Sequence, residues 1–201
     1  LGQIRRATSS LPSGLPRVSA TRPAQLRLPD AATGQSGLRV FVKFDDHLMP
    51  AYRRPVVEFV PLARRDWLSL SWPEKRRGVD ASLLTKWLSQ VYPPGVMERV
   101  DKVTKQPFAI TRVTGTLSLS PHTPYAGERY AVASGNVRLE DSSDDNFFFE
   151  GTLDLVLTYT RNDPEVQTVK GVFRGLYPRL DRLRGTTRKI ALDAVFESRP
   201  R

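Results

Sequence analysis

Two runs of alternating apolar and polar residues, joined by a turn sequence, form the clearest pattern in the chain. They span residues 147–177, and alternation with period two is typical of β-strands that bury one face. Asn162-Asp163-Pro164-Glu165 between the runs favours a type I turn, because proline fixes φ at the second turn position and a short polar side chain bonds the turn backbone. The segment is therefore predicted to be a long β-hairpin. Its buried face is expected to carry Leu153, Leu155, Leu157, Tyr159, Val169, Phe173 and Tyr177.

The opposite face of this hairpin carries charge. Asp154 lies there on the first strand, and Arg174 lies there on the second. Gly171 and Gly175, four residues apart on a strand, indicate close packing or a bend.

Similar alternation predicts further strands in residues 38–44, 55–63, 110–120, 129–140 and 188–198. Strands at this spacing, joined by polar loops, are typical of an antiparallel meander. We expect a mainly β fold with a minor α part, in which the meander forms a barrel or a sandwich. The expected buried faces carry Val40, Val42, Val113, Leu117, Leu119, Val132, Val137, Leu139, Ile190, Leu192, Ala194 and Phe196.

One amphipathic helix is predicted over residues 80–91. Asp80 is a suitable N-cap, and Pro93-Pro94-Gly95 ends the helix. We expect this helix to pack across an opening of the sheet, while the preceding residues 64–77 are expected to be irregular, with Trp67 and Trp72 partly buried. The expected buried stripe consists of Leu83, Leu84, Trp87, Leu88 and Val91.

The composition divides the chain into a tail and a domain. Residues 1–36 are rich in proline and arginine and cannot bury a helix face or a strand face, so they are predicted to be an extended tail or linker. Residues 37–201 are predicted to form a single β-rich domain, which is large enough to fold without disulfides. No run of 18 apolar residues is present, so no transmembrane helix is expected.

The chain contains 31 basic and 21 acidic residues and no cysteine. The absence of cysteine excludes thiol catalysis and thiolate metal sites, and it is compatible with a secreted or periplasmic bacterial protein. The net charge of +10 makes an anionic partner plausible. A solvated basic face is the alternative interpretation of this charge.

The basic residues concentrate between positions 174 and 189, where six stand against one acid. Arginine binds phosphates and sulfates through its planar fork, so this segment is a candidate for binding an anionic glycan or nucleic acid. Tyr177 is the only aromatic residue in the segment, which argues against stacking of single-stranded bases. The candidate ligand-binding residues are Asp154, Arg174, Arg179, Arg182 and Arg184.

An acidic loop precedes the aromatic run at residues 147–149. Asp141, Asp144 and Asp145 could supply carboxylate oxygens to Ca²⁺, although their spacing is not that of an EF-hand. The alternative is a solvated loop whose like charges discourage strand aggregation. No other cofactor is predicted.

Catalytic signals are weak throughout the sequence. His47 and His122 are the only histidines, and no nucleophile elbow, phosphate-binding loop or zinc motif is present. Asp154 could serve a hydrolase if its face lined a pocket with a second acid, and this leaves a carboxylate hydrolase as an alternative. We expect a non-enzymatic binding or accessory domain, exported from a bacterium, with an unidentified ligand or protein partner.

Overall fold

The computed structural model describes residues 36–45, 55–92, 99–122, 128–143, 147–181 and 184–198. Eight strands form one antiparallel sheet in the order β2-β1-β8-β7-β6-β5-β4-β3, which confirms the predicted mainly β meander. The sheet is not closed, since β2 and β3 stand at its two edges. The strands are β1 (Gly37–Phe44), β2 (Val56–Pro61), β3 (Arg77–Asp80), β4 (Ile110–Pro121), β5 (Arg129–Asp141), β6 (Phe148–Tyr159), β7 (Val166–Asp181) and β8 (Thr186–Ser198).

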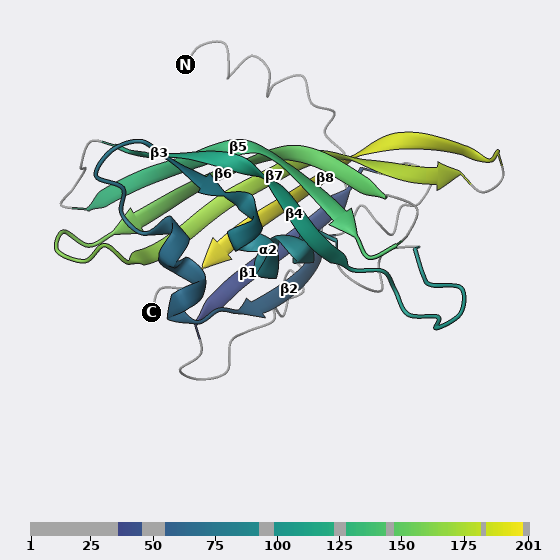
Figure 1. Cartoon of the computed structure of the whole chain (residues 1–201), viewed down its shortest axis with the longest axis horizontal. Coiled ribbons are helices and arrows are strands. Elements are labelled where there is room, and N and C mark those ends of the chain that lie inside the picture. Colours follow the sequence, from purple (N-terminus) through teal and green to yellow (C-terminus); the bar gives the residue numbers. More distant parts are fainter. Residues whose placement is uncertain are drawn as a thin grey trace, which may run out of the picture.

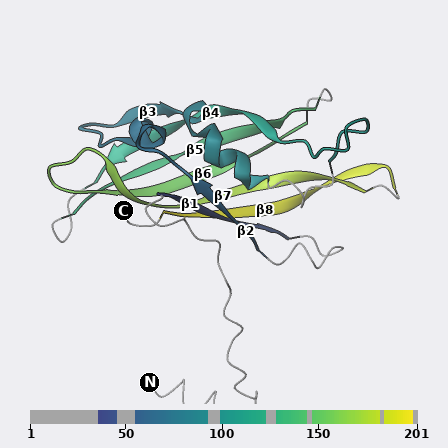
Figure 2. The ribbon, with the colours of Figure 1, turned by 90° about the horizontal axis from the view of Figure 1, so that it is seen from below.

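The sheet bends around a short helical segment (Figure 1). This segment consists of η3 (Ala81–Leu84), α2 (Thr85–Leu88) and η4 (Ser89–Val91). Figure 2 shows β3 and β4 on one side of it and β1, β2 and β8 on the other. Trp87 packs edge-on against Phe196 with 4.8 Å between ring centroids. The expected packing of the helix against the sheet is therefore confirmed, and we call the face toward it the inner face.

The helical segment differs from the prediction in its regularity. Asp80 does cap its beginning, since its carboxylate accepts a hydrogen bond of 2.9 Å from the Ser82 backbone N–H. The first turn, however, is a 3₁₀ helix, which has three residues per turn. Leu83 is consequently 61% exposed, whereas Leu84 and the other three predicted stripe residues are buried. The prediction that Leu83 is buried was wrong.

The buried faces of the strands follow the predicted alternation with one exception. Leu153, Phe173 and the other hairpin residues predicted to be inside are buried. Val132 is only half-buried, because Ala131 and Ala133 occupy the inner face of β5. Val132 and Val137 are five positions apart, so they cannot share one face of a regular strand. The prediction was wrong for Val132.

Residues 64–77 contain more regular structure than expected. Arg64–Leu70 forms the 3₁₀ helix η2, and the edge strand β3 begins at Arg77. Trp72 is partly buried against the core, as expected. Trp67, which was also expected to be partly buried, is buried within η2. The short β3 was missed because its four residues, RGVD, include only one large apolar side chain.

Several predictions lie outside the described residues. They concern the tail of residues 1–35, His47 and the helix end at Pro93-Pro94-Gly95. Within the described ranges, no helix has the length and apolar character needed to cross a membrane.

Candidate functional site

A straight row of five residues crosses the middle of the sheet. Cross-strand pairing places them side by side on β4, β5, β6, β7 and β8, and three of the five are glycines. In order, the row consists of Gly115, Val137, Gly151, Gly175 and Leu192.

Two glycines in this row, Gly151 and Gly175, let the backbone lie directly on the buried Phe173 ring. A Cβ atom on Gly151 would stand 2.5 Å from the Phe173 ring and 2.4 Å from the Arg174 carbonyl oxygen. A Cβ atom on Gly175 would stand 2.7 Å from the same ring. Gly115 has a φ of +129°, a conformation that other residues rarely adopt. At Gly151 and Gly175, therefore, no side chain separates the backbone from the Phe173 ring.

The outer face is hollowed along the same row. The hollow, here called the transverse trough, has a volume of about 770 Å³ and extends over five adjacent strands, which corresponds to roughly 19 Å at the usual strand spacing. Its floor includes four residues of the row. The remaining lining residues are Thr114, Asn136, Arg138, Glu150, Thr152, Arg174, Leu176, Ala191 and Asp193.

Part of the charge in the trough is already paired. The Arg138 side chain forms ion pairs of 2.8 Å with Glu140 and 3.6 Å with Glu150. Thr152 Oγ1 donates a hydrogen bond of 3.1 Å to Asn136 Oδ1. These contacts fix one cation and two polar side chains as parts of the trough wall.

Arg174 differs from Arg138 in this respect. It is exposed and lies opposite Thr152 on β6 and Asp193 on β8. Within the described residues, neither the Arg174 guanidinium nor the Asp193 carboxylate forms a hydrogen bond or ion pair. Directly opposed residues of antiparallel strands have Cβ atoms about 5 Å apart. The trough therefore presents adjacent donor and acceptor groups to a ligand.

Asp154 lies on the same outer face as Arg174, as the alternation predicted, but it does not line the trough. Its cross-strand partners are Ser134 and Val172. The half-buried Asp154 carboxylate accepts a hydrogen bond of 2.5 Å from Ser134 Oγ. The structure thus gives Asp154 a polar partner within the sheet.

The other predicted arginines lie apart from the trough. Arg179 and Arg184 belong to the far end of the β7–β8 hairpin, which extends beyond the rest of the sheet (Figure 1). Arg179 is directly opposite Arg188. It is five positions from Arg174 on the same strand, so it lies on the other face of the sheet. Arg182 lies outside the described residues.

The acidic loop gives a different result at each predicted position. The Asp141 side chain is fully buried, and its Oδ2 atom accepts a hydrogen bond of 2.9 Å from Arg99 Nε. Its Oδ1 atom accepts from the Ser143 backbone N–H at 2.9 Å. Asp144 and Asp145 lie outside the described residues. The described part of the chain contains no cluster of three acidic or histidine side chains suited to a metal ion.

Sequence reasoning identified Arg174 but missed Asn136, Thr152 and Asp193. Each of these polar residues occupies an outward position of a strand, where polar side chains are ordinary. The row of glycines was the available signal. It becomes visible only when the register of five strands is known, because the glycines are far apart in sequence.

Comparison with protein-family models, with curated proteins and with solved structures finds no match to this chain.

Proposed function

We propose that this chain is a non-enzymatic binding domain or accessory subunit, and that its ligand carries an anionic group and binds in the transverse trough. The observation that carries the proposal is the Arg174 guanidinium, which has no partner among the described side chains and stands above a floor of glycine backbone. Arginine suits an anionic group because its fork donates two parallel hydrogen bonds to carboxylate, phosphate or sulfate.

The neighbours of Arg174 add selectivity to this binding. Asp193 accepts hydrogen bonds beside it, while Asn136 and Thr152 are held in place by their mutual bond. A ligand with both an anionic group and hydroxyl or amide donors satisfies both charges. An anion without such donors pairs with Arg174 but faces Asp193, so it needs further contacts in order to bind.

The placement of the acids favours binding over hydrolysis. Carboxylate-based glycoside hydrolysis needs two carboxyl groups facing each other across the scissile bond. The acids that line the trough, Glu150 and Asp193, stand on β6 and β8 with Arg174 on the strand between them. Glu150 is also paired with Arg138.

The proposal includes export from a bacterium. Its support is the absence of cysteine, which leaves nothing to mispair in an oxidising compartment. Fractionation of cells that express the full-length gene product tests this part, and recovery in the cytosol would contradict it.

Nuclear magnetic resonance titration tests the site. We expect hexagalacturonate, a carboxylated and hydroxyl-rich probe, to shift the amide signals of Gly151, Gly175 and their neighbours. Arg174→Ala should abolish these shifts. Lys170→Ala is the matched control, because Lys170 is an exposed cation on the same face of β7 and lies outside the trough. Equal loss of binding in both variants would reduce the effect to general charge attraction and overturn the proposal.

A second candidate function, binding of an anionic polymer, is favoured by the projecting end of the β7–β8 hairpin. Arg179 and Arg188 oppose each other there, and Arg184 and Lys189 lie nearby in the hairpin. A cluster of arginine and lysine side chains attracts a polyanion, because its binding releases the counterions condensed on the polymer. In the same titration, shifts confined to residues 184–189 would support this function in place of the trough.

A further inference from the structure

A second hollow adjoins the transverse trough where β6 and β7 separate. This fork hollow has a volume of about 430 Å³ and shares Glu150 and Leu176 with the trough, so the two hollows are neighbours. Its other lining residues are Phe147, Phe148, Phe149, Pro178 and Lys189.

The fork arises where the β6–β7 ladder stops. Glu150 and Leu176 are the last paired residues at this end of the two strands. Beyond them, Phe149 pairs with β5 and Tyr177 pairs with β8. Pro178 has no backbone N–H to donate, so it cannot supply the donor that continued pairing would need.

The fork hollow leaves apolar surface in contact with water. Leu176 is 52% exposed and Phe148 is 38% exposed, and both line the fork hollow. The hollow also contacts Phe147 and Phe149, whose rings lie 6.5 Å apart in the inner aromatic cluster. An apolar chain that entered the fork would remove Leu176 and Phe148 from water, which is favourable in proportion to the area buried.

Three cations lie beside this apolar surface, and one of them, Arg138, is already paired with Glu140 and Glu150. The Arg138 guanidinium carbon lies 3.4 Å from the Phe148 ring centroid, and Lys189 lines the hollow opposite Pro178. Arg174 is two residues from Leu176 on β7, a distance of roughly 7 Å along a strand. Among the described residues, Glu150 is the one acid in the lining of the fork hollow, and it is paired with Arg138.

We infer that the ligand of this site is an anionic amphiphile, whose anionic group binds Arg174 and whose apolar chain lies over Leu176 into the fork hollow. This inference rests on the proposed function and names its ligand class. A polar polymer satisfies the trough but leaves Phe148 and Leu176 in water. An amphiphile is complementary to both hollows. When its anionic group binds Arg174, its apolar chain can follow the direction from Leu176 to Phe148.

Isothermal titration with dodecanoate below its micelle concentration tests the inference on the full chain. We expect saturable binding to one site, and no measurable binding of acetate, which lacks the chain. Dodecyl maltoside, which has the chain but no charge, should bind at least about tenfold more weakly, as expected for the loss of one charge-assisted hydrogen bond.

Two leucine variants distinguish binding in the fork hollow from nonspecific hydrophobic binding. Leu176→Ser should weaken dodecanoate binding about tenfold, since a partly buried leucine side chain contributes on that scale. Leu180→Ser is the matched control, because Leu180 is 53% exposed on the same face of β7 but lines neither hollow. Its affinity should be unchanged. Equal weakening in both variants would overturn the inference.

The outcomes also separate this inference from the proposed function. If hexagalacturonate shifts the trough amides but dodecanoate does not bind, the amphiphile is wrong and the binding function stands. If neither probe affects the trough, both are wrong. Binding to phosphatidylglycerol vesicles that is unaffected by Leu176→Ser would indicate a membrane surface and would also contradict the inference.

Discussion

The two ends of the β6–β7 hairpin are built differently. At the turn end, Asp163 Oδ1 accepts a hydrogen bond of 2.8 Å from the Glu165 backbone N–H, as the turn sequence predicted. The Pro164 carbonyl accepts from the Trp72 N–H at 2.8 Å, and the buried Tyr159 hydroxyl donates to the Leu70 carbonyl at 2.6 Å. These bonds attach the turn end to the segment that precedes β3.

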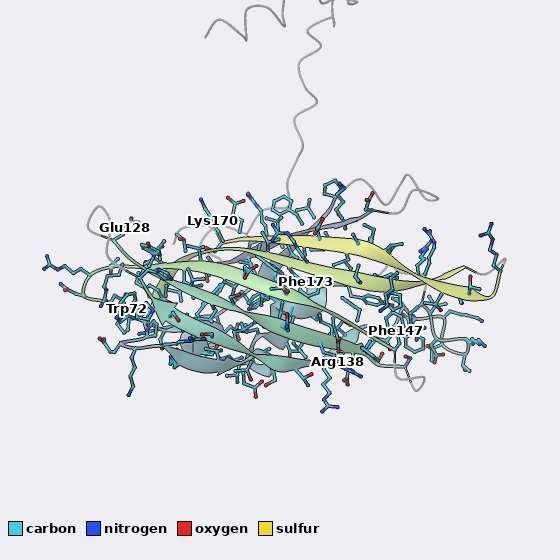
Figure 3. All side chains as sticks on the ribbon, turned by 90° about the horizontal axis from the view of Figure 1, so that it is seen from above. Trp72, Glu128, Arg138, Phe147, Lys170 and Phe173 are labelled. Atoms are coloured by element: carbon cyan, nitrogen blue, oxygen red, sulfur yellow. The ribbon has the colours of Figure 1, made fainter. Side chains whose placement is uncertain are left out.

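The fork end lacks such closure. The strands separate after Glu150, and apolar side chains remain exposed beside the fork. The Tyr92 hydroxyl is buried among the rings of Phe147, Phe149 and Tyr177, yet it forms no hydrogen bond in the described structure. Burial, together with the nearby Tyr177 and Asp141 side chains, raises the pKa of Tyr92. Figure 3 shows Trp72 and Phe147 toward opposite ends of the sheet.

The contrast indicates where stability and binding are located. At the turn end, the buried polar groups are hydrogen-bonded, and these bonds hold the hairpin in one arrangement. At the fork end, apolar side chains stay exposed and the Tyr92 hydroxyl has no hydrogen bond in the described structure. This lowers the stability of the fold but leaves a place for a ligand. The same two strands therefore serve as support at one end and as a candidate site at the other.

The largest effect is expected at the glycine row. Gly151→Val places side-chain atoms where the Phe173 ring and the Arg174 carbonyl lie, so we expect a loss of about 3 kcal/mol in the free energy of unfolding. Urea unfolding measures it. Gly78→Ala is the control, because its new Cβ atom meets only a Thr116 methyl group, at 3.3 Å. A Gly151 variant as stable as the control would show that close packing does not form the trough.

A matched pair of tyrosine variants compares the two ends directly. Tyr159→Phe leaves the buried Leu70 carbonyl without this donor and should cost about 2 kcal/mol. Tyr92→Phe removes a buried hydroxyl that lacks a hydrogen bond, so it should change stability by less than about 0.5 kcal/mol. Thermal unfolding of the two variants side by side provides the test. Equal losses of stability would mean that the buried polar groups at the two ends are equally well hydrogen-bonded.

The turn itself should show a smaller effect. Asp163→Ala removes the side-chain acceptor of the Glu165 N–H, and we expect a loss of about 1 kcal/mol. Asn162→Ala, at the neighbouring position, should have little effect, since no hydrogen bond involves the Asn162 side chain in the described structure. Chemical denaturation distinguishes the two. If Asn162→Ala is the more damaging change, the turn is held differently from this description.

The smallest predicted effect is a pH dependence near the turn end. Burial, the largest single influence, raises the pKa of Asp66, but hydrogen bonds from Lys86 and the Ala63 N–H and the charges of Lys86 and Arg65 together hold it below 3.8. A lowered folded pKa stabilises the fold above the unfolded pKa, and this contribution is lost as pH falls through the folded value. Asp66→Asn should therefore lower stability by about 0.5 kcal/mol near neutral pH and have no effect at low pH. A constant difference at all pH values would contradict this assignment.

The sequence predicted the structural features that depend on residues close together in the chain. The inner faces of most strands, the capping role of Asp80 and the bond made by Asp163 follow from neighbouring residues, and the structure contains them. Leu83 was misplaced because the helix begins as 3₁₀, a difference that apolar spacing does not reveal. The trough could not be predicted, because Gly115, Gly151 and Gly175 come together only through the register of strands that are distant in sequence.

Hydrogen exchange at the glycine row is the sharpest test of whether a ligand with an anionic group binds in the transverse trough at Arg174. Amide exchange is measured for Gly151 and Gly175 in the trough and for Leu157 and Val169 in the turn half of the hairpin, with and without hexagalacturonate. The account predicts that the probe slows exchange of the two glycine amides in the unmodified chain but not in Arg174→Ala, and leaves Leu157 and Val169 unchanged. Glycine amides that exchange at the same rate with and without the probe, or that are slowed equally in Arg174→Ala, would contradict it.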